Sequence, residues 1–193
     1  MILYLHGFAS TGEGGKWEIL RDAFHGFDVQ SPTLPVDPID CMEFIGKLID
    51  NTPEPHLVVG TSLGGFYAYH CASLFNVPAV IINPAMEPWL GLDEYIGTVE
   101  RFDTDGDTFD WTREHVENLK VLAAQSGRAP GQLVHFFLAR DDELLDHSEV
   151  PTEYQEAATM TWFESGGHRF ERFIELVPKI REILSARERF MHD

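Results

Sequence analysis

The chain has 193 residues, 44% of them hydrophobic and 12% aromatic, which is enough to bury the core of a single domain over residues 1–193. Its 14 basic and 32 acidic residues give a formal net charge of -18, which argues against nucleic acid or an anionic membrane surface as a partner. No apolar run approaches the roughly 18 to 20 residues of a membrane span, and no secretory signal precedes the first apolar run, so we expect a cytoplasmic protein.

Short apolar runs alternate with longer segments of helical periodicity along almost the whole chain. The short runs predict strands at residues 2–5, 28–30, 57–60, 79–83, 133–139 and 159–163. The longer segments predict helices at residues 13–25, 38–51, 63–76, 113–126, 148–157 and 169–187. Pro178 should kink or split the last helix, because proline lacks a backbone N–H. This alternation predicts a three-layer α/β fold, in which a mostly parallel sheet of about six strands carries helices on both faces.

Residues 84–112 break the alternation and carry several aromatic side chains. Within them, residues 98–102 and 108–111 predict a β-hairpin with Asp105-Gly106 at its turn. Thr112 is then the predicted N-cap of the following helix. We expect this segment to form a small lid-like insertion over a site at the edge of the sheet.

The acidic hairpin tip offers one alternative, a calcium loop. Asp103, Asp105, Asp107 and Glu114 occupy positions 1, 3, 5 and 12 of that pattern. However, Gly106 falls at the fourth position, whereas the sharp turn of a calcium loop needs its glycine at the sixth. A solvated hairpin tip explains these charges better, so we expect no metal and no cofactor.

The motif Gly60-Thr61-Ser62-Leu63-Gly64 lies between a predicted strand and a predicted helix. This spacing is typical of a nucleophile elbow, a strained turn that exposes a serine hydroxyl at the start of a helix. The glycines on either side allow the strand and the helix to approach closely. Ser62 is therefore the candidate nucleophile.

A second short motif, His6-Gly7-Phe8, follows the first predicted strand and so lies at the carboxyl edge of the sheet. The backbone N–H groups of Phe8 and Leu63 could there face the oxyanion of a tetrahedral intermediate. We expect His6 to brace this loop rather than to act in the chemistry.

His168 lies in the sequence Ser165-Gly166-Gly167-His168-Arg169, between the last predicted strand and the last helix. A histidine in this loop can reach back to the serine and exchange a proton near neutral pH, so His168 is the candidate general base. We interpret most of the other histidines as surface or packing residues: His25, His56, His70, His115, His135, His147 and His192.

The carboxylate that orients the histidine should follow the strand at residues 133–139. Asp142 is the preferred candidate there, and Asp141 is the alternative, because loop geometry cannot be predicted to a single residue. Glu143 and Asp146 are interpreted as solvated turn residues.

The chain order Ser62, Asp142, His168 resembles that of the α/β-hydrolases. More narrowly, the sequence resembles the small bacterial YqiA-like esterases, the UPF0227 group. The shared motifs cover nearly the whole chain: Leu3-Tyr4-Leu5-His6-Gly7-Phe8 with Ser10, Gly60-Thr61-Ser62-Leu63-Gly64-Gly65-Phe66, Ile82-Asn83-Pro84-Ala85, Asp142-Glu143-Leu144-Leu145-Asp146 and Gly166-Gly167-His168. The group usually has Gly-Asp before the glutamate, so Asp142 matches its acid and Asp141 stands where glycine is expected.

This resemblance implies hydrolysis of short-chain carboxylic esters or thioesters, without a metal or cofactor. We therefore predict a serine esterase with a Ser–His–Asp triad that acts on a small-molecule ester through an acyl-enzyme. A thioesterase or an acyltransferase with the same triad is an alternative, as is a binding module with the hydrolase fold and no turnover. The sequence leaves the acyl length and the oligomeric state undetermined.

Overall fold

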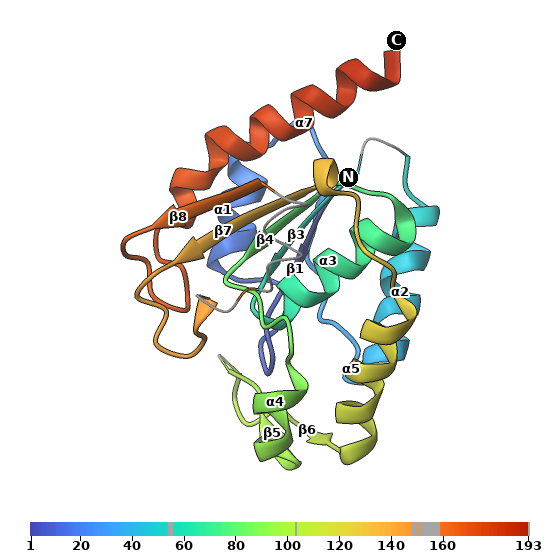
Figure 1. Ribbon diagram of the computed structural model, residues 1–193, viewed down its shortest axis with the longest axis vertical. Coiled ribbons are helices and arrows are strands. Elements are labelled where there is room, and N and C mark those ends of the chain that lie inside the picture. The colour runs from blue at the N-terminus through green and yellow to red at the C-terminus, as the bar shows by residue number, and fades with distance from the viewer. Residues whose placement is uncertain (54–55, 103, 148–149, 151–158, 193) are drawn as a thin grey trace.

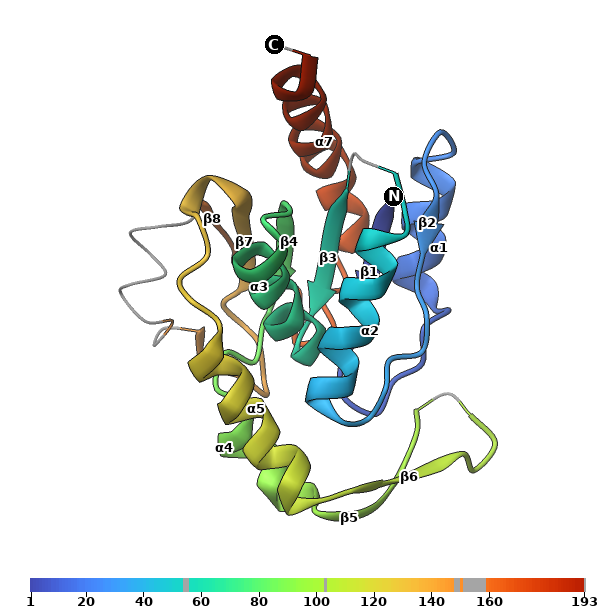
Figure 2. The same ribbon diagram turned by 90° about the vertical axis from the view of Figure 1, so that its right-hand side faces the viewer.

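Six parallel strands form the central sheet of the computed structural model, which describes residues 1–53, 56–102, 104–147, 150 and 159–192 (Figures 1 and 2). Their order across the sheet is β2-β1-β3-β4-β7-β8, and each pairs in parallel with its neighbours. The strands are β1 (Ile2–Leu5), β2 (Val29–Gln30), β3 (Leu57–Thr61), β4 (Ala79–Ile82), β7 (Val134–Ala139) and β8 (Thr159–Phe163). The predicted α/β fold with a six-stranded parallel sheet is confirmed.

The described helices are α1 (Gly15–Ala23), α2 (Pro38–Asp50), α3 (Leu63–Phe75), α4 (Trp89–Leu92), α5 (Arg113–Gln125) and α7 (Val177–His192). Short 3-10 helices, η1 (Asp93–Tyr95), η2 (Gly131–Leu133) and η4 (Phe173–Leu176), connect some of them. The predicted helix at residues 148–157 lies outside the described residues, apart from Val150.

Alternate residues of each strand point into two separate hydrophobic clusters. Leu3 and Leu5 of β1 belong to a cluster that includes buried side chains from α2, α3 and α5. Ile2 and Tyr4 belong to the other cluster, to which α1, η4 and α7 contribute. In Figure 1, α1 and α7 accordingly lie on one side of the sheet, and α2, α3 and α5 lie on the other. Helices therefore cover both faces, as the pattern predicts.

The segment predicted as one helix over residues 169–187 is divided in the structure. Residues 169–172 form turns, η4 follows, and the α-helix α7 begins only at Val177. Pro178 is thus in the first turn of α7, where its missing N–H has no intrahelical acceptor to lose. The predicted split is confirmed, whereas the predicted start of the helix at residue 169 is wrong.

The predicted hairpin is present, with β5 (Gly97–Glu100) paired antiparallel with β6 (Thr108–Trp111). Gly106 adopts a φ of 76° near the tip, which favours glycine. Thr112 caps α5 as predicted, and it forms a capping box with His115. In Figure 2 the strands β5 and β6 lie at the bottom of the view, below the sheet and below α2.

None of the helices in the described ranges is long and apolar enough to cross a membrane. The parallel arrangement also has a consequence for function. Because all six strands point the same way, the loops that follow β1, β3, β4, β7 and β8 meet at one edge of the sheet. The candidate site residues lie in these loops or directly after these strands.

One buried side chain in α3 makes the fold sensitive to pH. His70 is 4% exposed, and neither of its ring nitrogens has a hydrogen-bond partner among the described residues. Its ring packs edge-on against Phe66, at 4.3 Å between centroids. Burial lowers the pKa of His70 to about 4, because the charged imidazolium would lose its hydration.

We predict that His70 makes the folded state less stable as the pH falls from about 6.5 to 4. Over this range the unfolded chain binds a proton at His70 and the folded chain does not, so the loss approaches roughly 3 kcal/mol. Urea unfolding at pH 7.5 and 4.5 should show a loss of stability that is roughly 2 kcal/mol smaller in His70→Leu than in the wild type. Equal losses in the two proteins would contradict this.

Candidate active site

Ser62 occupies a strained turn between β3 and α3. Its backbone has φ 54° and ψ -121°, a region that residues other than glycine rarely adopt. A Cβ at Gly60 would lie 2.0 Å from the carbonyl oxygen of Gly64, and a Cβ at Gly64 would lie 2.0 Å from that of Leu5. Gly60 thus permits the close contact between β3 and α3 that the motif predicts, and Gly64 permits an equally close contact between α3 and the end of β1.

The imidazole of His168 connects Ser62 to Asp142. His168 Nε2 lies 3.1 Å from Ser62 Oγ, and His168 Nδ1 lies 3.0 Å from both carboxylate oxygens of Asp142. An ionised carboxylate only accepts hydrogen bonds, so Nδ1 carries the hydrogen and Nε2 presents its lone pair to the serine hydroxyl. The structure therefore brings the three sequence-predicted residues together in one continuous chain of hydrogen bonds.

The Asp142 side chain is 1% exposed, and its carboxylate is surrounded by donors. Burial by itself would raise its pKa, but hydrogen bonds from His147, His168 and the backbone N–H groups of Leu144 and Leu145 outweigh burial and hold the pKa well below its usual value. Asp142 is consequently ionised at any pH at which His168 could act as a base.

The neighbouring acids hold the backbone of the loop that carries His168. Asp141 Oδ1 accepts the N–H of Gly167 at 2.9 Å, and Glu143 Oε2 accepts the N–H of His168 at 2.8 Å. Of the two alternatives for the orienting acid, it is Asp142, and not Asp141, that faces the imidazole. Glu143 is exposed, as expected for a turn residue, but its contact with the loop of His168 was not predicted.

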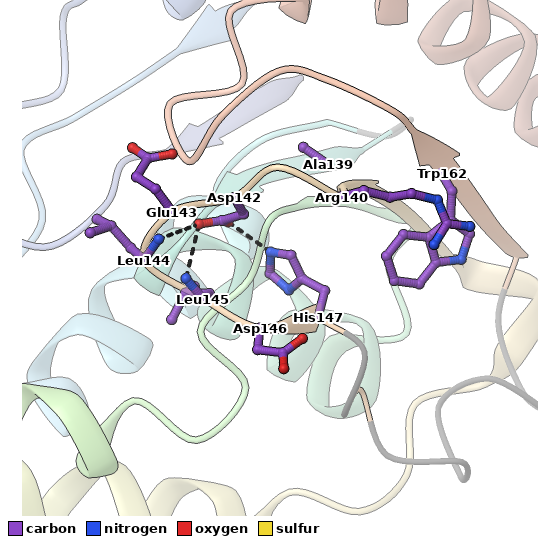
Figure 3. Close-up of a pocket in the computed structure, with 9 residues that line it drawn as sticks. All are labelled: Ala139, Arg140, Asp142, Glu143, Leu144, Leu145, Asp146, His147 and Trp162. Atoms are coloured by element: carbon purple, nitrogen blue, oxygen red, sulfur yellow. Dashed lines mark hydrogen bonds and ion pairs between the residues drawn. The ribbon is translucent and has the colours of Figure 1, made fainter.

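His147 is a site residue that the sequence analysis missed. It was expected to be a surface or packing residue, and it is buried, but its Nε2 also lies 2.8 Å from Asp142 Oδ2. Figure 3 shows it beside Asp142. The two line a cavity of about 730 Å³, whose other lining residues are Ala139, Arg140, Glu143, Leu144, Leu145, Asp146 and Trp162. In the sequence, this role was indicated only by the position of His147, a second histidine on the loop that carries the candidate acid Asp142.

Asn83 is a second residue whose part in the site was not predicted. It is fully buried, with a φ of 40°, directly after β4. Its side-chain amide donates to the carbonyl of Gly167 at 2.9 Å and to that of His168 at 3.3 Å, and its Oδ1 accepts the N–H of Ala139 at 2.8 Å. Asn83 thus ties the end of β7 to the loop of His168.

The loop after β1 lies against Ser62. A Cβ on Gly7 would be 3.4 Å from the Cβ of Ser62. His6 braces the loop, as expected, because its Nε2 accepts the N–H of Leu34 at 2.9 Å and its Nδ1 donates to the carbonyl of Gly7 at 2.9 Å. Burial lowers the pKa of His6, which keeps the ring neutral.

The two backbone groups predicted to bind an oxyanion flank this region. Leu63 is the first residue of α3, so its N–H has no acceptor within the helix. Phe8 directly follows Gly7, and its N–H has no acceptor in the part of the chain that the structure describes. Both groups are therefore available to a ligand.

The β5–β6 hairpin is attached to the same loop. The N–H of Phe102 donates to the carbonyl of Ala9 at 2.7 Å, and Arg101 Nη1 donates to that of Ser10 at 3.2 Å. The Phe8 ring also packs edge-on against Tyr95 and two aromatic residues of β6, Phe109 and Trp111.

The calcium alternative gains no support from the described residues of the hairpin. Asp107 forms an ion pair with Arg101 at 3.1 Å, and Asp103 lies outside the described residues. No cluster of three or more His, Cys, Asp or Glu side chains suited to a metal occurs in the described part of the chain.

Comparison with protein families identifies the chain. The model of the Uncharacterised protein family (UPF0227) matches residues 1–185. The chain belongs to the UPF0227 family. A UPF0227 protein of Vibrio parahaemolyticus is 27% identical over 191 residues, which cover 94% of this chain and 98% of that protein. One from Vibrio cholerae is 29% identical over 178 residues, 89% of this chain and 92% of its own.

Solved structures place this UPF0227 protein in the α/β-hydrolase fold. A monoacylglycerol lipase of Paleococcus ferrophilus superposes with a TM-score of 0.67 at 17% identity, covering 95% of this chain and 93% of its own. Est1E of Butyrivibrio proteoclasticus, with ferulic acid bound, has a TM-score of 0.64 at 13% identity, with 96% and 89% covered. At these identities the likeness is one of fold.

Proposed function

We propose that this UPF0227 protein is a serine hydrolase that cleaves short-chain carboxylic esters through an acyl-enzyme. The observation that carries the proposal is the hydrogen-bond chain from Ser62 Oγ through His168 to the buried carboxylate of Asp142. A His168 ring that carries its hydrogen on Nδ1 and lies between Asp142 and Ser62 is arranged to activate the serine for acyl transfer. Two structural neighbours, one named as an esterase of Pyrococcus furiosus and one as a monoacylglycerol lipase, support the same reaction class.

In the proposed reaction, Ser62 Oγ attacks the ester carbonyl while His168 Nε2 accepts the hydroxyl proton. The oxyanion that forms would be bound by the N–H groups of Phe8 and Leu63. His168 then gives its proton to the departing alcohol, which leaves the acyl group on Ser62. Water, deprotonated by His168, releases the acid. Asp142 stabilises the imidazolium in both halves of the cycle.

We further propose that the chain forms a single domain in which residues 84–112 act as a cap. In this proposal the hairpin holds in place the loop after β1, which carries the N–H of Phe8. This rests on the hydrogen bonds from Arg101 and Phe102 to the backbone of Ser10 and Ala9. The Arg101 side chain is only 12% exposed and lies over the ring of Phe109 at 4.7 Å. Its position is therefore fixed by packing as well as by hydrogen bonds.

The nucleophile is tested with p-nitrophenyl esters from acetyl to dodecanoyl. Ser62→Ala should lower kcat by at least about 10⁴-fold, because it removes the hydroxyl that forms the acyl-enzyme. The exposed Ser185 of α7 provides a control, and Ser185→Ala should hydrolyse like the wild type. Activity that survives in Ser62→Ala would refute the proposal. Product analysis with added alcohols would distinguish hydrolysis from acyl transfer.

The two adjacent aspartates give a sharper test. Asp142→Asn should lower kcat by about 10³- to 10⁴-fold at neutral pH, because an amide can donate to Nδ1 and favour the wrong tautomer of His168. Asp141→Asn should cost less than about tenfold, because its amide oxygen can still accept the N–H of Gly167. The reverse order of effects would assign the orienting role to Asp141.

The cap is tested by comparing two substitutions in the hairpin. Arg101→Met keeps an apolar side chain over Phe109 but removes the hydrogen bond to Ser10, so kcat should fall roughly five- to tenfold. Asp107→Asn disrupts the ion pair and leaves the bond to Ser10, so kcat should stay within about twofold. Equal kcat values for Arg101→Met and the wild type would show that the hairpin does not support the loop.

A further inference from the structure

Two imidazole rings contact one buried carboxylate. His147 Nε2 lies 2.8 Å from Asp142 Oδ2, and the same carboxylate accepts from Nδ1 of His168. The His147 side chain is 4% exposed and that of Asp142 is 1% exposed, so water competes little for these contacts. Because an ionised carboxylate only accepts, the hydrogen of neutral His147 must be on Nε2.

We propose that His147 is a positioning residue of the active site, which holds Asp142 in place and sets how strongly that carboxylate stabilises a proton on His168. This inference rests on the proposed serine-hydrolase function, because it concerns His168 as a base. His147 acts through Asp142 and takes no part in bond making or breaking.

The two carboxylate oxygens of Asp142 accept from different sets of donors. Oδ1 accepts the backbone N–H groups of Leu144 and Leu145, each at 2.9 Å, in addition to His168. Among the described residues, Oδ2 accepts only from the two imidazoles. Without His147, the orientation of Oδ2 would depend on His168 alone, which is the group that Asp142 has to orient.

The hydrogen bond from His147 also affects the negative charge that Asp142 presents to His168. An N–H at Oδ2 draws part of the negative charge toward His147, so the carboxylate stabilises an imidazolium at His168 less than it would alone. His147 and His168 therefore compete for the charge of one carboxylate.

Among the described residues, other charged side chains also line the cavity beside His147. Arg140, Glu143 and Asp146 line the same cavity (Figure 3). Arg140 is paired with Glu164 at 3.1 Å, and Glu143 accepts the backbone N–H of His168. None of these described side chains is a histidine.

The experiment compares His147→Leu with His147→Gln, whose amide nitrogen can replace Nε2 as a donor but does not titrate. We expect His147→Leu to lower kcat for p-nitrophenyl acetate about tenfold and to move the acid limb of kcat/KM upward by about half a pH unit. His147→Gln should restore kcat to within about twofold of the wild type. Urea unfolding of each variant separates these effects from loss of the fold.

Two outcomes would overturn the inference. One is a wild-type kcat and acid limb in His147→Leu. The other is an equal fall of kcat in both variants with an unchanged acid limb, which would make His147 a purely structural residue. Either result leaves the proposed function intact as long as Ser62→Ala is inactive.

A measurement independent of turnover keeps the inference testable if the wild type hydrolyses no ester. The hydrogen on Nδ1 of His168 should give an NMR resonance whose chemical shift changes in His147→Leu and stays close to the wild-type value in His147→Gln. A wild-type chemical shift in His147→Leu would overturn the inference, whereas absent turnover with the expected change in His147→Leu would contradict only the proposed function.

Discussion

The close approach of β3 and α3 at Ser62 is the constraint on which the rest of the site depends. Neither Gly60 nor Gly64 has room for a Cβ, because such an atom would lie within 2.0 Å of a backbone oxygen. The turn between them forces Ser62 into a conformation that costs on the order of 1–3 kcal/mol, which the surrounding hydrogen bonds must offset. The N–H of Ser62 donates to Ile82, and its carbonyl accepts from Ala85, so the end of β4 holds the turn from the other side.

The loops after β4, β7 and β8 are held together by polar contacts and not by regular structure. Asn83, Asp141 and Glu143 each bind the backbone next to His168, and Asp142 binds its ring. A buried carboxylate such as that of Asp142 is costly unless donors surround it, and here two imidazoles and two backbone N–H groups do so. The same set of contacts thus supports both the shape of the loops and the charge beside His168.

The hairpin and the loop after β1 stabilise each other. An isolated two-stranded hairpin is marginal in water. This one gains stability from Trp111, which is 2% exposed, donates to the carbonyl of Leu92 and packs against Phe8. Phe8 in turn belongs to the loop that lies against Ser62, so the insertion is structurally coupled to the site although it is separate from the main sheet.

Local periodicity and glycine spacing were enough to predict the alternation of strands and helices, the parallel sheet, the hairpin and the turn at Ser62. They also limited the orienting acid to Asp141 or Asp142. Contacts between distant segments establish that Asp142 faces His168, that His147 shares its carboxylate and that Asn83 anchors the loop. The direction of a side chain in an irregular loop is set by contacts with segments far along the chain, and Asn83 is separated from Gly167 by 84 residues. No local pattern encodes such contacts, so they become visible only when the strand ends are brought to one edge of the sheet.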